Sequence, residues 1–329
     1  MDKVWKKIML FGSGIITAVF LVYYLLGRFN YPKMDSLYSV KCAVFLGVLL
    51  LAFITLCLVQ IKKAKKGVTT GFSELVNVFI KYRFLLAQLI GKEFKVKYRR
   101  SYLGIAWSLV NPFLMMIVVS AVFSFVFRFN IEKFPAYLIL GQIMFNFFSE
   151  ATQFSLMSVL SSGQLIKKVY IPKYIFPVSK TLFSGLNFLI TFIPALSVLL
   201  YYKIYPAISF AYLPLFLLYF LMFTLGVGLV LATAEVFLRD VQHLYGVLLL
   251  ALGYVTPVFY PAESLSQGMQ FALKFNPLYH YLQYFRDVMF YHNCPTVEQN
   301  VMCLGMSILV LVIVIIFFER KQKKFILYI

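Results

Sequence analysis

The stretch KEFKVKYRRSYLGIAWSLVNPFLMM, residues 92–116, changes character at its centre. Its first nine residues carry five cations and one anion, whereas the 26 residues from Tyr102 to Phe127 carry no formal charge. An uncharged run of that length is typical of a helix that spans a bilayer, which needs about 20 mostly apolar residues. The cations before it suit the anionic headgroups of a membrane surface. The stretch therefore predicts a helix on the membrane surface, followed by one that enters the bilayer.

The composition of the whole chain is that of a membrane protein. Of 329 residues, 62% are hydrophobic and 13% are charged, and the core of a soluble domain is too small to bury that much apolar surface. The predicted fold class is all-α, a polytopic membrane helical bundle. About eight spans are predicted, near residues 8–27, 42–61, 103–127, 135–160, 176–202, 211–236, 241–259 and 301–318.

The formal net charge of +19 is explained better by membrane topology than by binding to nucleic acid. Lys and Arg gather in the cytoplasmic loops of membrane proteins. With both termini in the cytoplasm, 23 of the 31 Lys and Arg residues fall in cytoplasmic segments and 8 in outer segments. We therefore expect a multi-pass protein with both termini cytoplasmic and no nucleic-acid partner.

Two units are predicted along the chain. Residues 1–68 comprise a transmembrane hairpin and the basic linker KKAKKG, which starts at Lys62. The first apolar run is long, lacks a small-residue cleavage site and is soon followed by a second run, so we interpret it as a retained helix rather than a signal peptide. Residues 69–329 comprise the other six spans, preceded by a helix over residues 72–100.

Residues 72–100 are predicted to form an amphipathic helix in the inner membrane interface, because apolar side chains recur on one face and polar ones on another. The apolar set is Leu75, Phe79, Tyr82, Leu86, Leu89 and Ile90, and the polar set is Lys81, Gln88, Lys92, Lys95 and Arg99. Each cation near an anionic leaflet contributes about 1 kcal/mol of attraction. The alternative is that the cluster is only a positive-inside anchor.

The chain carries no pattern that marks an enzyme acting alone. A nucleotide-binding loop of the form GxxxxGK[ST] is absent from the sequence. His243, His280 and His292 have no metal-ligand spacing and the four cysteines have no CxxC spacing, so no metal site and no catalytic residue is predicted. The motifs GSG at Gly12 and GVG at Gly226 lie inside apolar spans and predict close packing between helices.

Glu150 places a charge inside the fourth predicted span, within FNFFSEATQFS. A carboxylate at the centre of a spanning helix costs about 2.5–3.5 kcal/mol to insert, so it is expected to face other helices or water rather than lipid. Two interpretations stay open. Glu150 lines a substrate path or a joint between subunits, or it makes a packing hydrogen bond inside the bundle, with its carboxyl group protonated or ionised.

The segment LIKKVYIPKYIFPVSK, residues 165–180, is short, basic and placed in the cytoplasm. Its prolines can each end or begin a helix. We expect a short helix parallel to the membrane that presents Lys167, Lys168 and Tyr170 to a soluble partner. The alternative is an ordinary tight basic loop.

The outer segment, residues 261–295, is apolar and aromatic rather than polar. It predicts two short helices that dip into the outer leaflet, the second opened by Pro277. Non-helical backbone at such depth has to be covered by protein or line a cavity, which suggests an outer gate.

The order of these motifs resembles one family. They are YRRSYLGIAWSLVNPFLMM, FNFFSEAT, LIKKVYIPKYIFPVSK, FLRDVQHLYGVLLLALGYVTPVFYP and NPLYHYLQYFRDV. Over about residues 72–329 the chain is similar to the membrane permease subunits of type-2 ABC exporters of the polysaccharide (O-antigen and teichoic acid) export family, which act in the bacterial cytoplasmic (inner) membrane. The family's core has six spans, so the hairpin of residues 1–68 is an addition to it.

The resemblance implies a homodimer that works with two copies of a separate ABC ATPase subunit. ATP and Mg would bind to that partner, and this chain would hold no cofactor. The implied substrate is a polysaccharide or teichoic-acid-like polymer linked to undecaprenyl diphosphate. The alternatives are a type-2 ABC exporter of a lipid or drug and a membrane-embedded glycosyltransferase or acyltransferase, although no catalytic set of acids is found for the latter.

The resemblance also implies three sets of site residues, in addition to Glu150 as an intramembrane polar position. Arg and Lys suit phosphate recognition, and the C-terminal end of the interface helix supplies both. The lipid-diphosphate set is Lys95, Lys97, Tyr98, Arg99 and Arg100; the ATPase-coupling set is Leu165, Ile166, Lys167, Lys168, Val169, Tyr170 and Pro172; and the outer-gate set is Pro277, Tyr279, Tyr281 and Arg286.

Overall fold

The computed structural model describes residues 81–99, 104–123, 133–169, 171–205, 207–322 and 325–328. Its secondary structure is helical, and no strand is found within these ranges. The predicted hairpin of residues 1–68, the predicted start of the interface helix at residues 72–80 and Gly12 lie outside the described residues. The all-α class expected from the apolar runs is confirmed.

The helices follow the predicted order of spans. They are α4 (Arg83–Tyr98), α5 (Ala106–Val122), α6 (Phe134–Ser161), α7 (Gly163–Lys168), α8 (Ile175–Tyr201), α9 (Leu213–Phe237), α10 (Val241–Val255), α11 (Gln267–Leu273), α12 (Pro277–Met289), α13 (Val297–Gln322) and α14 (Phe325–Tyr328), with short 3-10 helices at Ile208–Tyr212 and Ala262–Ser264. Among the described residues, three helical stretches are long and apolar enough to cross a membrane. They are α8, Ser209–Phe237, which includes α9, and Val297–Val314 of α13. The apolar helices α5 and α10 are shorter.

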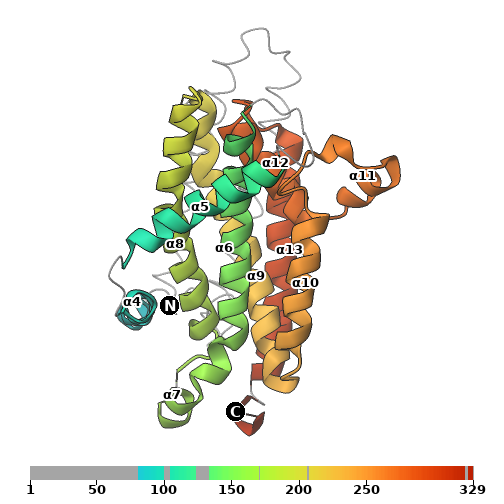
Figure 1. Ribbon diagram of the computed structural model, residues 1–329. Helices are drawn as coiled ribbons and strands as arrows, with labels where there is room; N and C mark the ends of the chain where they lie inside the picture. The colour runs from blue at the N-terminus through green and yellow to red at the C-terminus, as the bar shows by residue number, and fades with distance from the viewer. Residues whose placement is uncertain are drawn as a thin grey trace, which may run out of the picture.

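The helix α6 lies in the middle of the bundle (Figure 1). It packs against α8 and α9, and α9 packs against α13. Two glycines of α9 allow these close approaches: a Cβ atom on Gly226 would lie 2.6 Å from Cγ1 of Val310, and one on Gly228 would lie 2.8 Å from the side chain of Ser155. The close packing predicted for the GVG motif is therefore confirmed.

The helix α4 lies across the bundle and is seen end-on in Figure 1. Leu86 is buried, and Leu89 packs beside it on a cluster of buried apolar side chains that includes Ile175 of α8. Lys92, Lys95 and Arg99 are exposed on the other side, but apolar and polar side chains are not separated into two clear faces along Arg83–Tyr98. The amphipathic pattern predicted from the sequence is therefore weak in the described part of this helix.

The outward face of α4 also exposes Phe84 and Val96. Lys and Arg side chains can reach anionic headgroups while apolar neighbours contact the lipid, so such a mixed face suits a helix at a membrane surface. After α4 the chain turns, and Gly104 adopts φ 48°, a backbone conformation that glycine tolerates without steric strain. The oblique helix α5 then crosses α8 and α6 (Figure 1).

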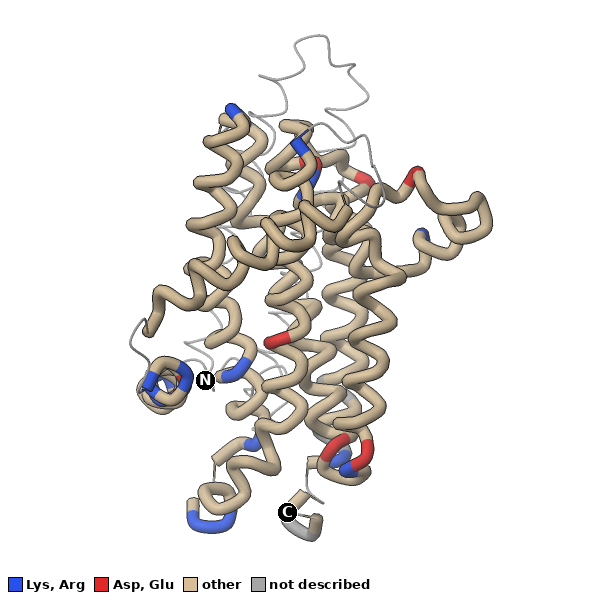
Figure 2. The backbone as a smooth tube through the Cα atoms, in the orientation of Figure 1, with Lys and Arg blue, Asp and Glu red and all other residues tan. Residues whose placement is uncertain are grey.

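Most charged residues lie towards the two ends of the bundle, with long uncharged stretches and one acidic position between them (Figure 2). The outer sides of these stretches are apolar, as shown by the exposed Leu189 of α8, Leu250 of α10 and Ile313 of α13. An apolar belt between charged ends is the surface expected of a protein that crosses a bilayer.

The two short helices predicted in the outer segment are α11 and α12, and they differ in burial. α12 begins at Pro277, and the side chain of Asn276 accepts a hydrogen bond from the backbone N–H of Leu278 at 3.0 Å. The rings of Tyr281, Tyr284 and Phe285 are buried in the core, where Phe285 stacks on Phe216 of α9 with centroids 4.8 Å apart. In contrast, α11 projects from the bundle and exposes Phe271 (Figure 1).

Candidate functional site

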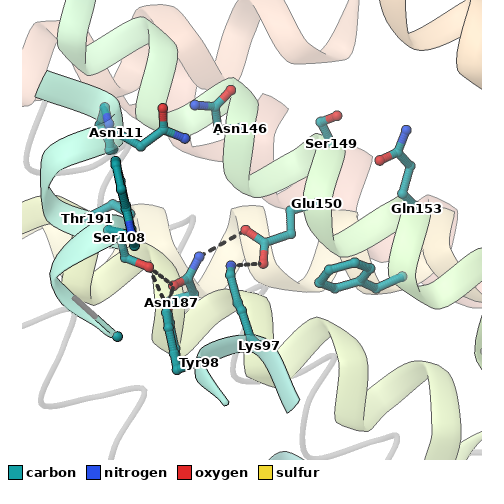
Figure 3. A pocket seen from close by; sticks show the side chains of 14 residues that line it. Lys97, Tyr98, Ser108, Asn111, Asn146, Ser149, Glu150, Gln153, Asn187 and Thr191 are labelled. Carbon is teal, nitrogen blue, oxygen red and sulfur yellow. Dashed lines mark hydrogen bonds and ion pairs between the residues drawn. The ribbon is translucent and has the colours of Figure 1, made fainter. Parts of the chain in front are cut away.

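A polar network joins α4, α5, α6 and α8 (Figure 3). Glu150 of α6 accepts a hydrogen bond from Nζ of Lys97 at 2.6 Å and another from Nδ2 of Asn187 at 2.9 Å. Oδ1 of Asn187 accepts from the hydroxyls of Tyr98 at 2.9 Å and Ser108 at 3.2 Å. These two hydroxyls are also hydrogen-bonded to each other. Through Asn187, the network thus fixes α8 against α4, α5 and α6 by side-chain hydrogen bonds.

The ion pair gives Glu150 a partner from another helix, as the cost of an isolated charge requires. The side chains of Lys97 and Glu150 are 31% and 22% exposed, so the pair stays partly open to its surroundings. A second ion pair ties α4 to α8, with 2.7 Å between Nζ of Lys180 and Oε2 of Glu93. Glu150 faces other helices, as expected, while a role for it on a substrate path stays a prediction.

The network borders a groove of about 600 Å³ that the described residues leave partly open. The helix α6 contributes Asn146, Ser149 and Gln153, which share one stripe of that helix with Glu150 because they are three or four residues apart. The helix α5 contributes Trp107, Asn111 and Ser108, and α8 contributes Asn187 and Thr191 (Figure 3). This set, called the polar groove below, was not predicted, although the stripe can be read in FNFFSEATQ.

The residues assigned to a lipid diphosphate lie on two sides of α4. Lys97 and Tyr98 belong to the network that faces α6 and α8. Lys95 and Arg99 are on the opposite face, where they line a shallow depression of about 740 Å³ with Lys92. Arg100 lies outside the described residues. The structure therefore brings Lys95 and Arg99 together and separates them from Lys97 and Tyr98.

The basic segment after α6 forms the short helix that was predicted, α7, at the end of the bundle where the C-terminus also lies (Figure 1). Ile166 is buried and Leu165 is half-buried, so the apolar side of α7 packs on the bundle. Lys167, Lys168 and Val169 are exposed.

Beyond α7, Pro172 is half-buried, whereas Tyr170 lies outside the described residues. Nζ of Lys173 donates a hydrogen bond to the backbone oxygen of Gln322 at 2.6 Å, which ties this segment to α13.

Of the residues assigned to an outer gate, Arg286 is the charged one, and it is buried, with 4% of its surface exposed. Its guanidinium donates to the hydroxyl of Tyr137 at 2.7 Å and to the backbone oxygens of Pro257 and Val258, both at 2.8 Å. It also stacks on the Tyr137 ring, 3.5 Å from the centroid. Burial lowers the pKa of Arg286 to about 10, which leaves the side chain charged at neutral pH.

The other gate residues are packed to different degrees. Tyr281 is fully buried, and its hydroxyl is hydrogen-bonded to the backbone oxygen of Cys303 at 2.8 Å and to Ser307 at 2.6 Å. Tyr279 is half-buried at the edge of α12, and Pro277 is its first residue. The helix that carries these residues is thus fixed to α6 and α13.

Within the described residues, no group of three His, Cys, Asp or Glu side chains could hold a metal ion. The polar groove carries neutral amides and hydroxyls around a single ion pair. Such a lining can bind polar groups by hydrogen bonds, but it holds no nucleophile next to a base.

Comparison with known proteins places these features in a family of transporters. A family model described as "ABC-2 type transporter" matches residues 85–290, a range that includes α5 to α12 and most of α4. An O-antigen export system permease protein RfbA of Klebsiella pneumoniae is 31% identical over 206 residues, 62% of this chain and 79% of the relative.

Two further relatives carry the same printed name. One, also from Klebsiella pneumoniae, is 28% identical over 195 residues, 59% of this chain and 75% of the relative. The other, from Myxococcus xanthus, is 29% identical over 254 residues, 76% of this chain and 97% of the relative.

Proposed function

This chain belongs to the ABC-2 type transporter family, and from that premise we propose that it is the permease subunit of an ATP-driven exporter of a lipid-linked polysaccharide. The observation that carries the proposal is the match to relatives named O-antigen export permeases, one of them along 97% of its length. The chain is a multi-pass membrane protein, and the proposed membrane is the bacterial cytoplasmic one, with both termini in the cytoplasm.

The proposed energy source is a separate ABC ATPase subunit, present in two copies beside a homodimer of this chain. ATP and Mg would bind to that partner, since this sequence has no GxxxxGK[ST] loop. The helix α7 is the proposed contact with the ATPase. Its buried Ile166 anchors it on the bundle, and Lys167, Lys168 and Val169 are exposed on its other side.

The proposed path of coupling runs from α7 into α6. Only Ser162 separates the two helices, so a displacement of α7 acts directly on α6. The helix α6 carries Glu150, which is tied to α4 through Lys97. Movement of α6 would therefore change the position of α4 at the membrane surface.

The proposed substrate is an O-antigen-like or teichoic-acid-like polymer on undecaprenyl diphosphate. Lys92, Lys95 and Arg99 on the outward face of α4 support a contact with its diphosphate, because cations at a membrane surface attract phosphate groups. At the outer end, α11 and the edge of α12 at Tyr279 are the proposed gate, with the packed remainder of α12 as its support.

The proposal is tested in a strain that lacks this gene and carries plasmid copies of the chain. Wild-type chain should restore surface polysaccharide. The double variant Lys167→Glu and Lys168→Glu should reach the membrane in normal amount. It should restore about one tenth or less of the wild-type surface polysaccharide, since a loss of 1.4 kcal/mol in binding the ATPase is a factor of ten. Purification should then recover less ATPase with the chain.

The matched control is Lys203→Glu, an exposed cation at the outer end of the bundle and outside the proposed gate, which should restore export fully. Normal export by the Lys167 and Lys168 variant would reject the coupling role of α7. Unchanged surface polysaccharide in the deletion strain would reject the proposed function itself.

A further inference from the structure

The polar groove contains side chains that the network around Glu150 does not use. Asn111 of α5 and Asn146 and Gln153 of α6 line it and are exposed. None of these three amides makes a hydrogen bond with another described residue. Asn146 lies in the middle of α6, about 18 Å from its first residue at about 1.5 Å per residue.

An amide in that position cannot face hydrocarbon at low cost. Transfer of an amide from water to an apolar medium without a hydrogen-bond partner costs about 4–8 kcal/mol. Three such groups converge on one groove, while the outer sides of the neighbouring helices are apolar. The groove is therefore suited to water or a polar ligand rather than to lipid chains.

The charge of the groove selects a neutral ligand. Among the described residues, the charged ones that line it are Lys97 and Glu150, and they neutralise each other at 2.6 Å. A phosphate or a metal ion would need an unpaired cation or a set of carboxylates. A side-chain amide, in contrast, both donates and accepts hydrogen bonds, as a sugar hydroxyl does.

The groove also offers a flat apolar surface beside its amides. Trp107 lines it from α5 and is 48% exposed. The apolar face of a sugar ring can stack on an indole ring while the hydroxyls at the ring edge reach polar neighbours. A volume of about 600 Å³ is within the range of small-ligand sites, and the part left open lets a polymer continue beyond it.

We propose that the polar groove is a saccharide-binding site, in which Asn111, Asn146 and Gln153 hydrogen-bond to sugar hydroxyls and Trp107 stacks on a sugar ring. The inference rests on the proposed function and adds the place and the residues of substrate contact. Asn187 and the ion pair hold the walls of this site together, because they link α4, α6 and α8 at its edge.

The first test uses the fluorescence of Trp107. The chain contains two tryptophans, so Trp5→Phe leaves Trp107 alone. The full-length chain in lipid nanodiscs is titrated with soluble oligosaccharides released by mild acid from the cells' own lipid-linked polymer. The emission should change and saturate, whereas undecaprenyl diphosphate without sugar should leave it unchanged. An emission that does not respond to the oligosaccharides would overturn the site.

Amide substitutions assign the contacts. Asn146→Ala and Gln153→Ala should each raise the half-saturating concentration about fivefold, the expected loss for one hydrogen bond. The matched control is Asn293→Ala, an exposed amide outside the groove, which should have no effect. Equal affinities in all three variants would contradict the proposed contacts.

A nearly isosteric variant keeps the test valid if the alanine variants fold poorly. Ser149→Cys places a thiol in the groove, where a charged, water-soluble thiol reagent should label it above the level of the parent chain. The oligosaccharides should slow that labelling. Leu250→Cys, on the apolar outer side of α10, should stay unlabelled.

The outcomes separate this inference from the function it rests on. Ser149→Cys that resists labelling would mean that lipid or a second copy of the chain fills the groove, and labelling that sugar does not slow would reject the sugar site. Either result overturns the proposed saccharide site. If the surface polysaccharide of the strain still depends on this gene, the proposed exporter function stands.

Discussion

Glu150 and Arg286 are both charged side chains inside the bundle, and the protein binds them in opposite ways. Arg286 donates to a tyrosine hydroxyl and two backbone oxygens in a tightly packed site. Glu150 pairs with the flexible side chain of Lys97 beside an open groove. Backbone oxygens cannot leave unless the chain moves, whereas a lysine can change partners. The first arrangement is a fixed support, and the second suits a joint.

The energies of the two arrangements support the same contrast. A partly exposed ion pair contributes about 1 kcal/mol or less, so water can replace it at little cost. A buried charge whose hydrogen bonds are broken costs several times more. We therefore expect the motion of transport between α4 and α6, while α12 stays fixed on α6 and α13.

The largest effect is expected at Arg286. Arg286→Met should lower the free energy of unfolding by about 3 kcal/mol or more, because hydrogen bonds from a charged donor are lost and their acceptors stay buried. Thermal unfolding of the purified chain in detergent should show this as a lower Tm. The control is Lys274→Met, an exposed cation. A Tm equal to that of the control would remove the fixed-support role.

A steric variant sharpens the same test without touching the charge. A Cβ atom on Gly141 would lie 2.6 Å from Nη2 of Arg286 and 2.9 Å from the backbone oxygen of Val258. Gly141→Ala should therefore destabilise the chain by about 1–3 kcal/mol, the usual cost of overpacking.

A smaller effect on stability is expected at the joint. Lys97→Glu and Glu150→Lys should each change the free energy of unfolding by about 1 kcal/mol, yet each should reduce export. The exchanged pair should recover part of the export, as a double-mutant cycle would show. The matched control is the exchange of Glu93 and Lys180, a pair of similar exposure that joins α4 to α8 without lining the groove. Strictly additive losses at Lys97 and Glu150 would contradict the joint.

Sequence alone predicts the elements of this fold well, because long apolar runs and the charge step at residues 92–102 report directly on the membrane. It also predicts that Glu150 needs a polar neighbour. It does not reveal Lys97 as that neighbour, since the two residues are 53 positions apart and meet only when α4 folds onto α6.

Burial of single charges is equally hidden in the sequence. Arg286 counts among the cations of the outer segments, but the side chain is enclosed by α6 and by the turn after α10. The acceptors that hold it are mostly backbone oxygens, which carry no residue-type signal. The stripe of Asn146, Ser149 and Gln153 is the opposite case, since helical spacing alone places these side chains beside Glu150.

We propose that this chain forms a passage and takes its energy from a partner. This proposal is tested most directly by transport in sealed vesicles that contain the chain with or without the co-purified ATPase. Lipid-linked oligosaccharide should cross the membrane only when both proteins and ATP are present. Transport at the full rate by this chain alone, with no ATPase and no ATP, would contradict it.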